Sequence, residues 1–245
     1  MRNLIKTKAI KMSLPSCVTT GNLFCGFLSV FYTIDGRLVL AAWLIILAGF
    51  MDALDGKVAR LAHAPSRFGV EFDSLADLCS FGAAPAILMF HYNLYFLGAW
   101  GMMMGFLFLL CGAIRLARFN VRLTGFDKEV FSGLPIPAAA GTLASYVVFS
   151  QNVLESLNII SLSAPLVVML SILMVSALEY DTLPKFAPHS AWNRCKLGFF
   201  LLAVFLVIFF TDKVFFPLSV VYVMSGLIRW FLHLVSDREV AGVMR

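Results

Sequence analysis

The sequence is poor in charge. Only 13% of its 245 residues are Asp, Glu, Lys or Arg, whereas 60% are hydrophobic and the mean hydropathy is +0.89. An ordinary soluble domain has about 25% charged and about 45–50% apolar residues, so this composition excludes a soluble globular protein. Several apolar runs reach the roughly 20 residues that cross a hydrocarbon layer of about 30 Å. We therefore predict an all-α, polytopic membrane protein.

The residues of several common sites are also missing. Five cysteines are scattered through apolar runs without a CxxC pair, so we expect them to be packing residues and expect no disulfide. Four dispersed histidines form no nucleophile–base pattern with a Ser or Cys. No nucleic-acid partner is expected.

Breaks between the apolar runs predict about eight transmembrane helices. These lie near residues 15–33, 38–60, 72–91, 94–117, 133–150, 158–178, 196–211 and 214–235. The basic segment 1–14 is predicted to be a short interfacial helix on the membrane surface, with its apolar side chains dipping in.

The basic residues predict the orientation. With eight helices and a cytosolic N-terminus, 17 of the 19 Lys and Arg residues fall in cytosolic segments, leaving only Arg37 and Lys213 outside. Positive charges retained in short cytosolic loops fix the orientation of a membrane protein. We expect a multi-pass protein of the cytoplasmic membrane with both termini in the cytosol.

Four aspartates form two pairs around a predicted turn between helices. Asp52 and Asp55 are three residues apart at the end of one helix, and Asp73 and Asp77 are four residues apart at the start of the next. Each pair shares a helix face. The two faces meet if the turn at residues 63–66 folds the second helix back antiparallel.

The depth of these aspartates predicts a metal site. About 21 Å of helix separates Leu38 from Asp52, which places the cluster near the cytosolic edge of the hydrocarbon. Four carboxylates there repel one another and lose hydration. A divalent cation relieves both effects, and oxygen ligands favour Mg²⁺ or Mn²⁺, as one ion or two. We predict Asp52, Asp55, Asp73 and Asp77 as its ligands.

Two classes of function use such a cluster. An ion transporter would need acidic residues at the midplane of several helices, whereas these acids gather on one side of the predicted bundle. An in-line attack of an alcohol on a metal-bound diphosphate, with a carboxylate accepting the proton, needs only the residues present. The residues favour phosphotransfer.

The spacing carries a family resemblance. The pattern Asp52-x2-Asp55-Gly56-x2-Ala59-Arg60-x8-Gly69-x3-Asp73-x3-Asp77 resembles, without a departure, the signature of the CDP-alcohol phosphatidyltransferases. The resemblance implies that the hydroxyl of an alcohol attacks the lipid-side phosphate of a CDP-linked lipid and releases CMP. It implies that the first three aspartates ligate metal, and that the fourth, Asp77, both touches metal and acts as the base.

The same resemblance implies a nucleotide site, a core and an assembly. It implies that Gly56, Ala59 and Arg60 line the cytidine diphosphate. From their own positions, Gly69 is expected to leave room for the nucleotide, and Thr19 and Asn22 either face it or hydrogen-bond between helices. Residues 15–180 form the implied six-helix core, and residues 181–245 add a cytosolic loop and two C-terminal transmembrane helices. A homodimer is implied by the family alone.

Further segments resemble the phosphatidylserine synthase branch of that family. They are residues 21–27, 72–77, 80–85, 115–120, 133–137 and 174–176. This branch implies CDP-diacylglycerol and L-serine as substrates. Other acceptors, such as glycerol phosphate or inositol phosphate, and an archaeal-type ether-lipid donor are the alternatives. The stretch 179–185 departs from the branch by an inserted residue and extra acids, which leaves the role of Lys185 open.

An amino-acid acceptor brings a carboxylate and an ammonium group. Arg115 and Arg118, one turn apart, offer a forked partner to that carboxylate, or anchor the helix to lipid phosphates. Ser80 and Asn120 are polar at a similar depth. We predict that they orient the serine, the alternative being hydrogen bonds within the core.

Overall fold

The computed structural model describes residues 2–62, 67–123, 133–153, 160–178, 180 and 211–243. Within these ranges every regular element is a helix. The elements are α1 (Arg2–Ile34), α2 (Leu38–Ala62), α3 (Arg67–Asp77), a π-helix (Leu78–Ala83), α4 (Ala84–Tyr92), a short 3₁₀ helix (Leu94–Leu97), α5 (Ala99–Leu123), α6 (Ile136–Val153), α7 (Ile160–Val175) and α9 (Thr211–Val243). The prediction of an all-α protein is confirmed for the described part of the chain.

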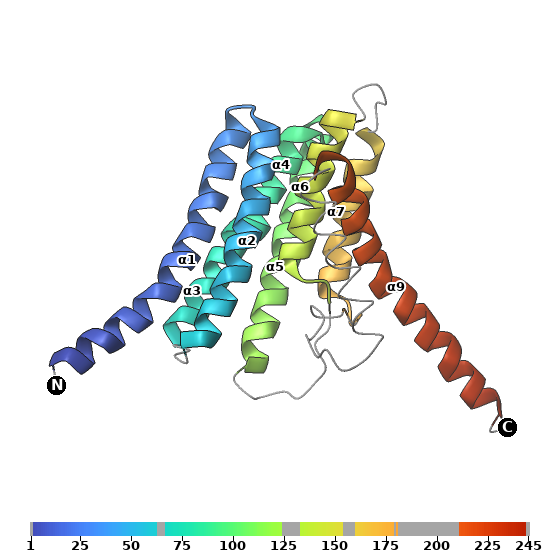
Figure 1. Ribbon diagram of the computed structural model, residues 1–245. Coiled ribbons are helices and arrows are strands. Elements are labelled where there is room, and N and C mark those ends of the chain that lie inside the picture. Colours follow the sequence, from blue (N-terminus) through green and yellow to red (C-terminus); the bar gives the residue numbers. More distant parts are fainter. Residues whose placement is uncertain are drawn as a thin grey trace.

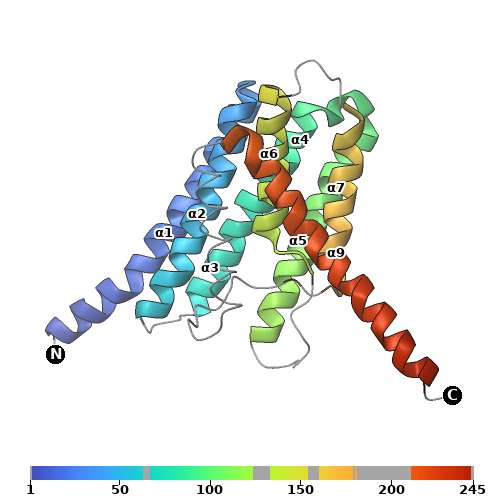
Figure 2. The same cartoon turned by 45° about the vertical axis from the view of Figure 1, so that its right-hand side comes forward.

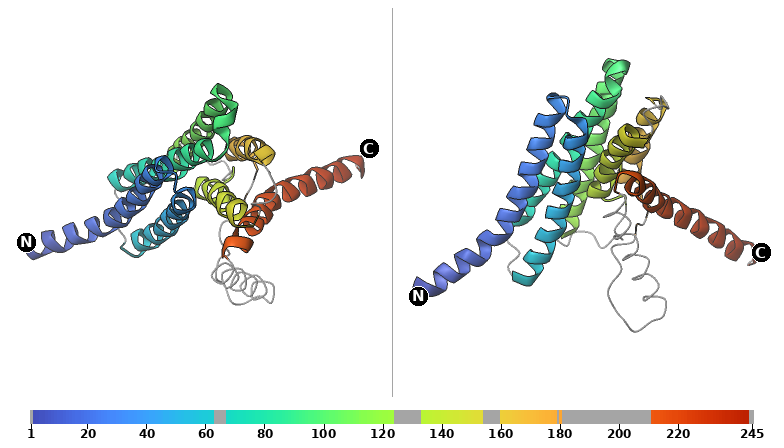
Figure 3. Two further views of the ribbon diagram at one scale, coloured as in Figure 1. Left: turned by 90° about the horizontal axis from the view of Figure 1, so that it is seen from above. Right: turned by 45° about the horizontal axis from the view of Figure 1, so that its top comes forward.

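The helices α1 to α7 stand side by side as a bundle (Figure 1). The joined ends of α2 and α3 lie on the same side of this bundle as both chain termini. Helix α9 crosses the bundle obliquely (Figure 2). Its C-terminal half and the N-terminal half of α1 extend away from the bundle in opposite directions (Figure 3).

Among the residues that the structure describes, three helices are long and apolar enough to cross a membrane. They are Phe68–Tyr92, Ala99–Val121 and Lys213–Phe231, and three shorter apolar helices are Val18–Ile34, Leu38–Leu54 and Leu162–Val175. Large apolar side chains also point outward from the bundle, among them Phe24 and Phe27 on α1, as is suitable for contact with lipid. The number of eight spans stays a prediction, and the predicted span 196–211 lies outside the described residues.

The basic N-terminal segment belongs to the same helix as the first predicted span. Helix α1 runs from Arg2 to Ile34, so residues 2–14 continue directly into the part that packs on α2. Its position on the membrane surface stays a prediction.

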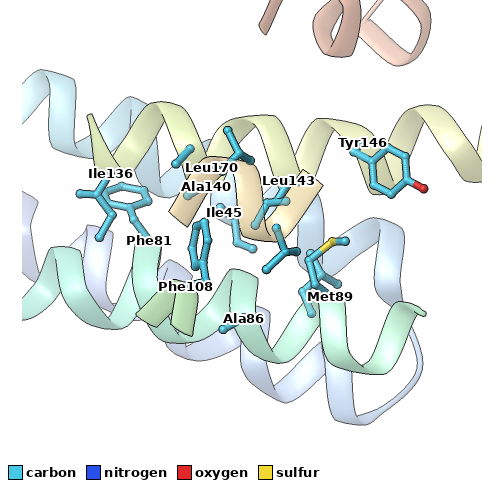
Figure 4. Close-up of a cluster of buried hydrophobic side chains, with 14 of the residues drawn as sticks. Ile45, Phe81, Ala86, Met89, Phe108, Ile136, Ala140, Leu143, Tyr146 and Leu170 are labelled. Carbon is cyan, nitrogen blue, oxygen red and sulfur yellow. The ribbon is translucent and has the colours of Figure 1, made fainter. Parts of the chain in front are cut away.

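Small and large side chains alternate in the core. Alanines at positions 41, 42 and 48 of α2, and at 139, 140 and 144 of α6, are fully buried, which lets neighbouring helices approach closely. Aromatic and aliphatic side chains fill the space between the helices: Phe81 from the π-helix, Phe108 from α5 and Ile45 from α2 meet in the bundle centre (Figure 4).

A neutral polar seam joins α4, α6 and α7. Tyr92 donates from its hydroxyl to Ser150 Oγ, and Asn93 donates from Nδ2 to Ser163 Oγ over 3.0 Å. The hydroxyls of Tyr146 and Ser163 lie 3.2 Å apart. These polar side chains satisfy one another and leave no charge in this part of the bundle.

The entry of α6 is joined to the end of α7 through Gly133. Its N–H donates to Leu178 O over 2.7 Å, and Leu134 N–H donates to Leu173 O over 3.0 Å. Gly133 has a φ of 98°, a conformation that costs other residues free energy. A Cβ there would collide with Met174 O and lie 3.3 Å from Ser176 O. The junction therefore requires glycine.

We expect Gly133→Ala to destabilise the protein. Strain at positive φ and the collision should cost about 1–3 kcal/mol, and each kcal/mol lowers the melting temperature of a chain of this size by roughly 2–4 °C. Gly141→Ala is the matched control, because a Cβ at this helical position meets nothing within 4 Å. Melting curves in detergent measure both. Equal melting temperatures for the two variants would contradict the account of this junction.

Candidate functional site

Three of the four signature aspartates converge where α2 meets α3. Asp52 comes from α2, and Asp73 and Asp77 come from successive turns of α3. One carboxylate oxygen from each lies within 4.8 Å of the others. The predicted meeting of two acidic helix faces therefore occurs in space. Asp55 lies one turn after Asp52 in α2, but its side chain is outside the described part.

The cluster extends from the bundle interior toward the surface. Asp77 is only 8% exposed, whereas Asp52 and Asp73 are partly exposed. Asp77 lies deepest because α3 continues from it directly into the buried π-helix. A ligand arriving from outside would meet the other two carboxylates before this one.

Asp77 is held by a side chain from α1. Asn22 is fully buried, and its Nδ2 donates to Asp77 Oδ1 over 3.0 Å. Ser80 Oγ donates in turn to the backbone carbonyl of Asn22, also over 3.0 Å. Thr19, one turn earlier on α1, is buried as well. The structure thus places Asn22 and Ser80 beside the cluster and bonded to each other.

The two predicted arginines have different surroundings. Arg115 is half-buried and lies within electrostatic reach of Asp77. Arg118 is exposed, and its guanidinium donates to Val175 O over 3.0 Å. Val175 is the last residue of α7, where helix carbonyls lack intrahelical donors. The structure therefore brings Arg115 to the cluster and directs Arg118 to the end of α7.

Asn120 lies against α3 and not within the aspartate cluster. Its Nδ2 is 3.0 Å from Ser74 Oγ and 3.5 Å from Glu71 Oε2. Ser74 lies between the two aspartates of α3 and also bonds to Val70 O of its own helix. Asn120 therefore fastens the end of α5 to the helix that carries Asp73 and Asp77.

The remaining predicted nucleotide residues stand on the same two helices. Gly56, Ala59 and Arg60 follow Asp55 in the last turns of α2, and Gly69 precedes Asp73 by one turn in α3. The side chains of positions 55–62 lie outside the described residues, as does Lys185. For positions 55–62 the structure gives only the place on α2.

Sequence reasoning missed three features of this site. It did not find the bond between Asn22 and Asp77, the bond between Ser74 and Asn120, or the π-helix after Asp77. Ser74 stands between two signature aspartates, which is a signal that could have singled it out. The pairing of Asn22 with Asp77 joins residues 55 positions apart, and one sequence carries no signal for that.

The three carboxylates suit a hard divalent cation. Oxygens bound to one Mg²⁺ at about 2.0–2.1 Å lie no more than about 4.2 Å apart. The three groups are within 4.8 Å of one another, so a small closing movement would let all three bind one ion. Carboxylate oxygens are also the donors that Mg²⁺ and Mn²⁺ prefer.

Comparison with known proteins agrees with this geometry. The CDP-alcohol phosphatidyltransferase family matches residues 12–178, which include the whole aspartate cluster. The chain is 39% identical over 229 residues to a CDP-diacylglycerol–serine O-phosphatidyltransferase of Helicobacter pylori, covering 91% of this chain and 92% of the relative. It is 34% identical over 180 residues to the Bacillus subtilis protein of that name, covering 74% and 94%.

A third relative is named for a different product. An archaetidylserine synthase of Methanothermobacter thermautotrophicus is 40% identical over 171 residues, covering 69% of this chain and 70% of the relative. The match of the family to more than half of the chain, the two long alignments and the convergence of the signature aspartates all agree. The chain belongs to the CDP-alcohol phosphatidyltransferase family.

Proposed function

We propose that this protein transfers the phosphatidyl group of CDP-diacylglycerol to the hydroxyl of L-serine, giving phosphatidylserine and CMP. The observation that carries the proposal is the 39% identity, over nine-tenths of both chains, to a relative named for this reaction. The aspartate cluster supports it, because the site offers oxygen ligands and a buried carboxylate. Its apolar helices and its family make the protein an integral membrane protein.

In the proposed reaction, serine attacks the lipid-side phosphorus directly. A bond forms between the serine hydroxyl oxygen and that phosphorus, while the bond from the phosphorus to the bridging oxygen breaks. CMP leaves with the electron pair, and the hydroxyl proton passes to Asp77. Asp77 suits this role because it is the most buried of the three clustered aspartates and is held by Asn22.

We assign the metal to the four signature aspartates. Asp52, Asp55, Asp73 and Asp77 would hold Mg²⁺ or Mn²⁺, which when bound neutralises the diphosphate and polarises its oxygens. The convergence of three of these carboxylates supports the assignment. Gly56, Ala59, Arg60, Gly69 and Thr19 would line the cytidine diphosphate, since all stand on the helices that surround the cluster.

We assign the acceptor carboxylate to Arg115 before Arg118. The support is the position of Arg115 within electrostatic reach of Asp77, which would receive the serine proton. Arg118 would reach the acceptor only after leaving Val175 O. Ser80 and Asn120 would orient the acceptor through the neighbours that they bond, Asn22 and Ser74.

The proposed topology has eight spans and a surface-bound segment 1–14, with both termini in the cytosol. Support comes from the position of the termini and the joined ends of α2 and α3 on one side of the bundle (Figure 1). We propose residues 15–180 as the catalytic core, residues 181–245 as a loop with two C-terminal helices, and a homodimer as the assembly. The family match to residues 12–178 supports the core.

A second candidate differs in the lipid donor. The 40% identity to an archaetidylserine synthase favours the same transfer from an ether-linked CDP-lipid. The reacting diphosphate and the serine would be unchanged, so the same aspartates would serve both donors.

The serine assignment predicts serine-dependent release of CMP. Purified protein with CDP-diacylglycerol, L-serine and Mn²⁺ should release CMP and form phosphatidylserine, both measured by chromatography. Glycerol phosphate and inositol phosphate replace serine in parallel reactions, and an ether-linked CDP-lipid replaces the donor. If CMP were released no faster with serine than without it, the serine assignment would be refuted. If CMP were released faster with another alcohol than with serine, that alcohol would be the acceptor.

The assignment of Asp77 as base predicts a loss of turnover without a loss of nucleotide binding. Asp77→Asn keeps the size of the side chain but removes the proton acceptor, so we expect turnover to fall at least about 100-fold. CMP affinity, measured by calorimetry with Mn²⁺, should stay within a few-fold of wild type, because Asp52, Asp55 and Asp73 would still hold the metal. Asp35→Asn is the control, since Asp35 pairs with Arg37 at the surface. Near-normal turnover of Asp77→Asn would exclude the assigned role.

The two arginines predict different kinetic effects. Arg115→Ala should raise the KM for serine at least tenfold, because a charge-assisted partner of the acceptor is removed. Arg118→Ala should raise it less, because its guanidinium is bonded to the end of α7. Steady-state kinetics of each variant, with serine and the CDP-lipid varied in turn, measure the KM for each substrate. If Arg118→Ala raised the KM for serine more than Arg115→Ala did, Arg118 and not Arg115 would be assigned to the acceptor carboxylate.

A further inference from the structure

We propose that Asn22 is the positioning residue of Asp77, and that it acts on the alcohol side of the reaction and not on the diphosphate. This inference rests on the proposed function for the role of Asp77 and goes beyond it in naming what orients the base. It is carried by the contacts that α1 makes with α3 and the π-helix.

The first contact fixes the carboxylate. Asn22 is fully buried and donates from Nδ2 to Asp77 Oδ1 over 3.0 Å. An ionised carboxylate only accepts hydrogen bonds, so the amide must present its nitrogen to it. A donor held at one oxygen fixes the plane of the carboxylate and leaves the other oxygen for the reaction.

The second contact fixes Asn22 itself. Ser80 Oγ donates to Asn22 O over 3.0 Å, although this carbonyl also belongs to the helical ladder of α1. One turn along α1, Gly26 makes room for Ser80: a Cβ at Gly26 would lie 2.7 Å from Ser80 Cα. The π-helix, which follows Asp77, therefore holds the backbone of Asn22 in place through Ser80.

Both contacts come from the segment where α3 passes into the π-helix. It runs from Leu78 to Ala83, with Asp77 as the residue immediately before it. A π-turn is wider than an α-turn and changes which side chains share a face. Asp77 meets the side chain of Asn22 while Ser80, three residues later, meets its backbone. Such turns occur frequently at functional sites.

The remaining polar atom of Asn22 indicates which substrate it faces. Its Oδ1 is buried and has no hydrogen-bond partner among the described residues. This atom is an acceptor, and the oxygens of a diphosphate are acceptors too, so they cannot satisfy it. The acceptor alcohol carries O–H and N–H donors and must approach Asp77 to lose its proton. The ribose hydroxyls and the cytosine amino group of the nucleotide are donors as well, so the bond to Asp77, which receives the proton of the alcohol, is what places Asn22 on the alcohol side.

The test compares three substitutions of Asn22 in the full-length protein. Asn22→Leu and Asn22→Asp remove the amide donor at nearly constant size, and we expect each to lower kcat about 10- to 100-fold, as loss of a supporting hydrogen bond does at other sites. Asn22→Gln keeps an amide on a longer arm and should retain at least about tenfold more activity than Asn22→Asp. The KM for the CDP-lipid and the calorimetric CMP affinity should stay within about twofold of wild type.

Matched variants separate positioning from folding. Thr33→Val removes a different buried polar group from α1, a hydroxyl that donates to Ser29 O of its own helix, and should keep wild-type kcat. Ser80→Ala should also lower kcat, but less than Asn22→Leu does. It removes the hydrogen bond to the backbone of Asn22 but leaves the amide that bonds to Asp77. Melting curves in detergent accompany each variant.

Two outcomes would overturn the proposal. A rise in the KM for the CDP-lipid, or a loss of CMP affinity, at unchanged kcat would place Asn22 at the nucleotide. If kcat fell only in variants whose melting temperature also fell, and Asn22→Gln were no more active than Asn22→Asp, Asn22 would have a purely structural role. The comparison uses whichever alcohol the wild-type protein accepts, so a failure of the serine assignment leaves the result for Asn22 readable.

Discussion

Repulsion among the carboxylates of Asp52, Asp73 and Asp77 is the constraint that the rest of the structure has to satisfy. Their oxygens lie within 4.8 Å of one another at the meeting of two apolar helices, where loss of hydration adds to the repulsion. A divalent cation bound by the three groups would offset both costs. Until then, the surrounding helices must keep the three groups in place against their mutual charge.

Contacts from neighbouring helices hold the aspartates in place against this repulsion. Asn22 holds Asp77 from α1, and Asn120 holds Ser74, between the two aspartates of α3, from α5. Arg115 adds a positive charge within reach of Asp77. These contacts approach the cluster from two helices that flank α3, so the acidic site is supported from more than one side. Elsewhere α4, α6 and α7 are joined by neutral hydrogen bonds, which need no such compensation.

Arg115 and Arg118 show why identical side chains one turn apart are not equivalent. Both stand on α5, but Arg115 lies within electrostatic reach of Asp77, whereas Arg118 bonds to the carbonyl end of α7. A helix end attracts a cation through its unsatisfied carbonyls. The same residue type therefore contributes to the electrostatics of the site at one position and to the packing of the bundle at the other.

The sequence by itself determined the helical class, the apolar character and the aspartates that would meet. These follow from local regularities: apolar run length, the 3.6-residue period and the fixed spacing of Asp52, Asp55, Asp73 and Asp77. Only the tertiary structure decided that Asn22 bonds to Asp77, that Asn120 bonds to Ser74 and that Arg118 turns to Val175. Each of these contacts joins helices far apart in the chain. Helical periodicity assigns the face on which a side chain lies, but not the residue of another helix that it meets. The π-helix after Asp77 is a further departure from that periodicity.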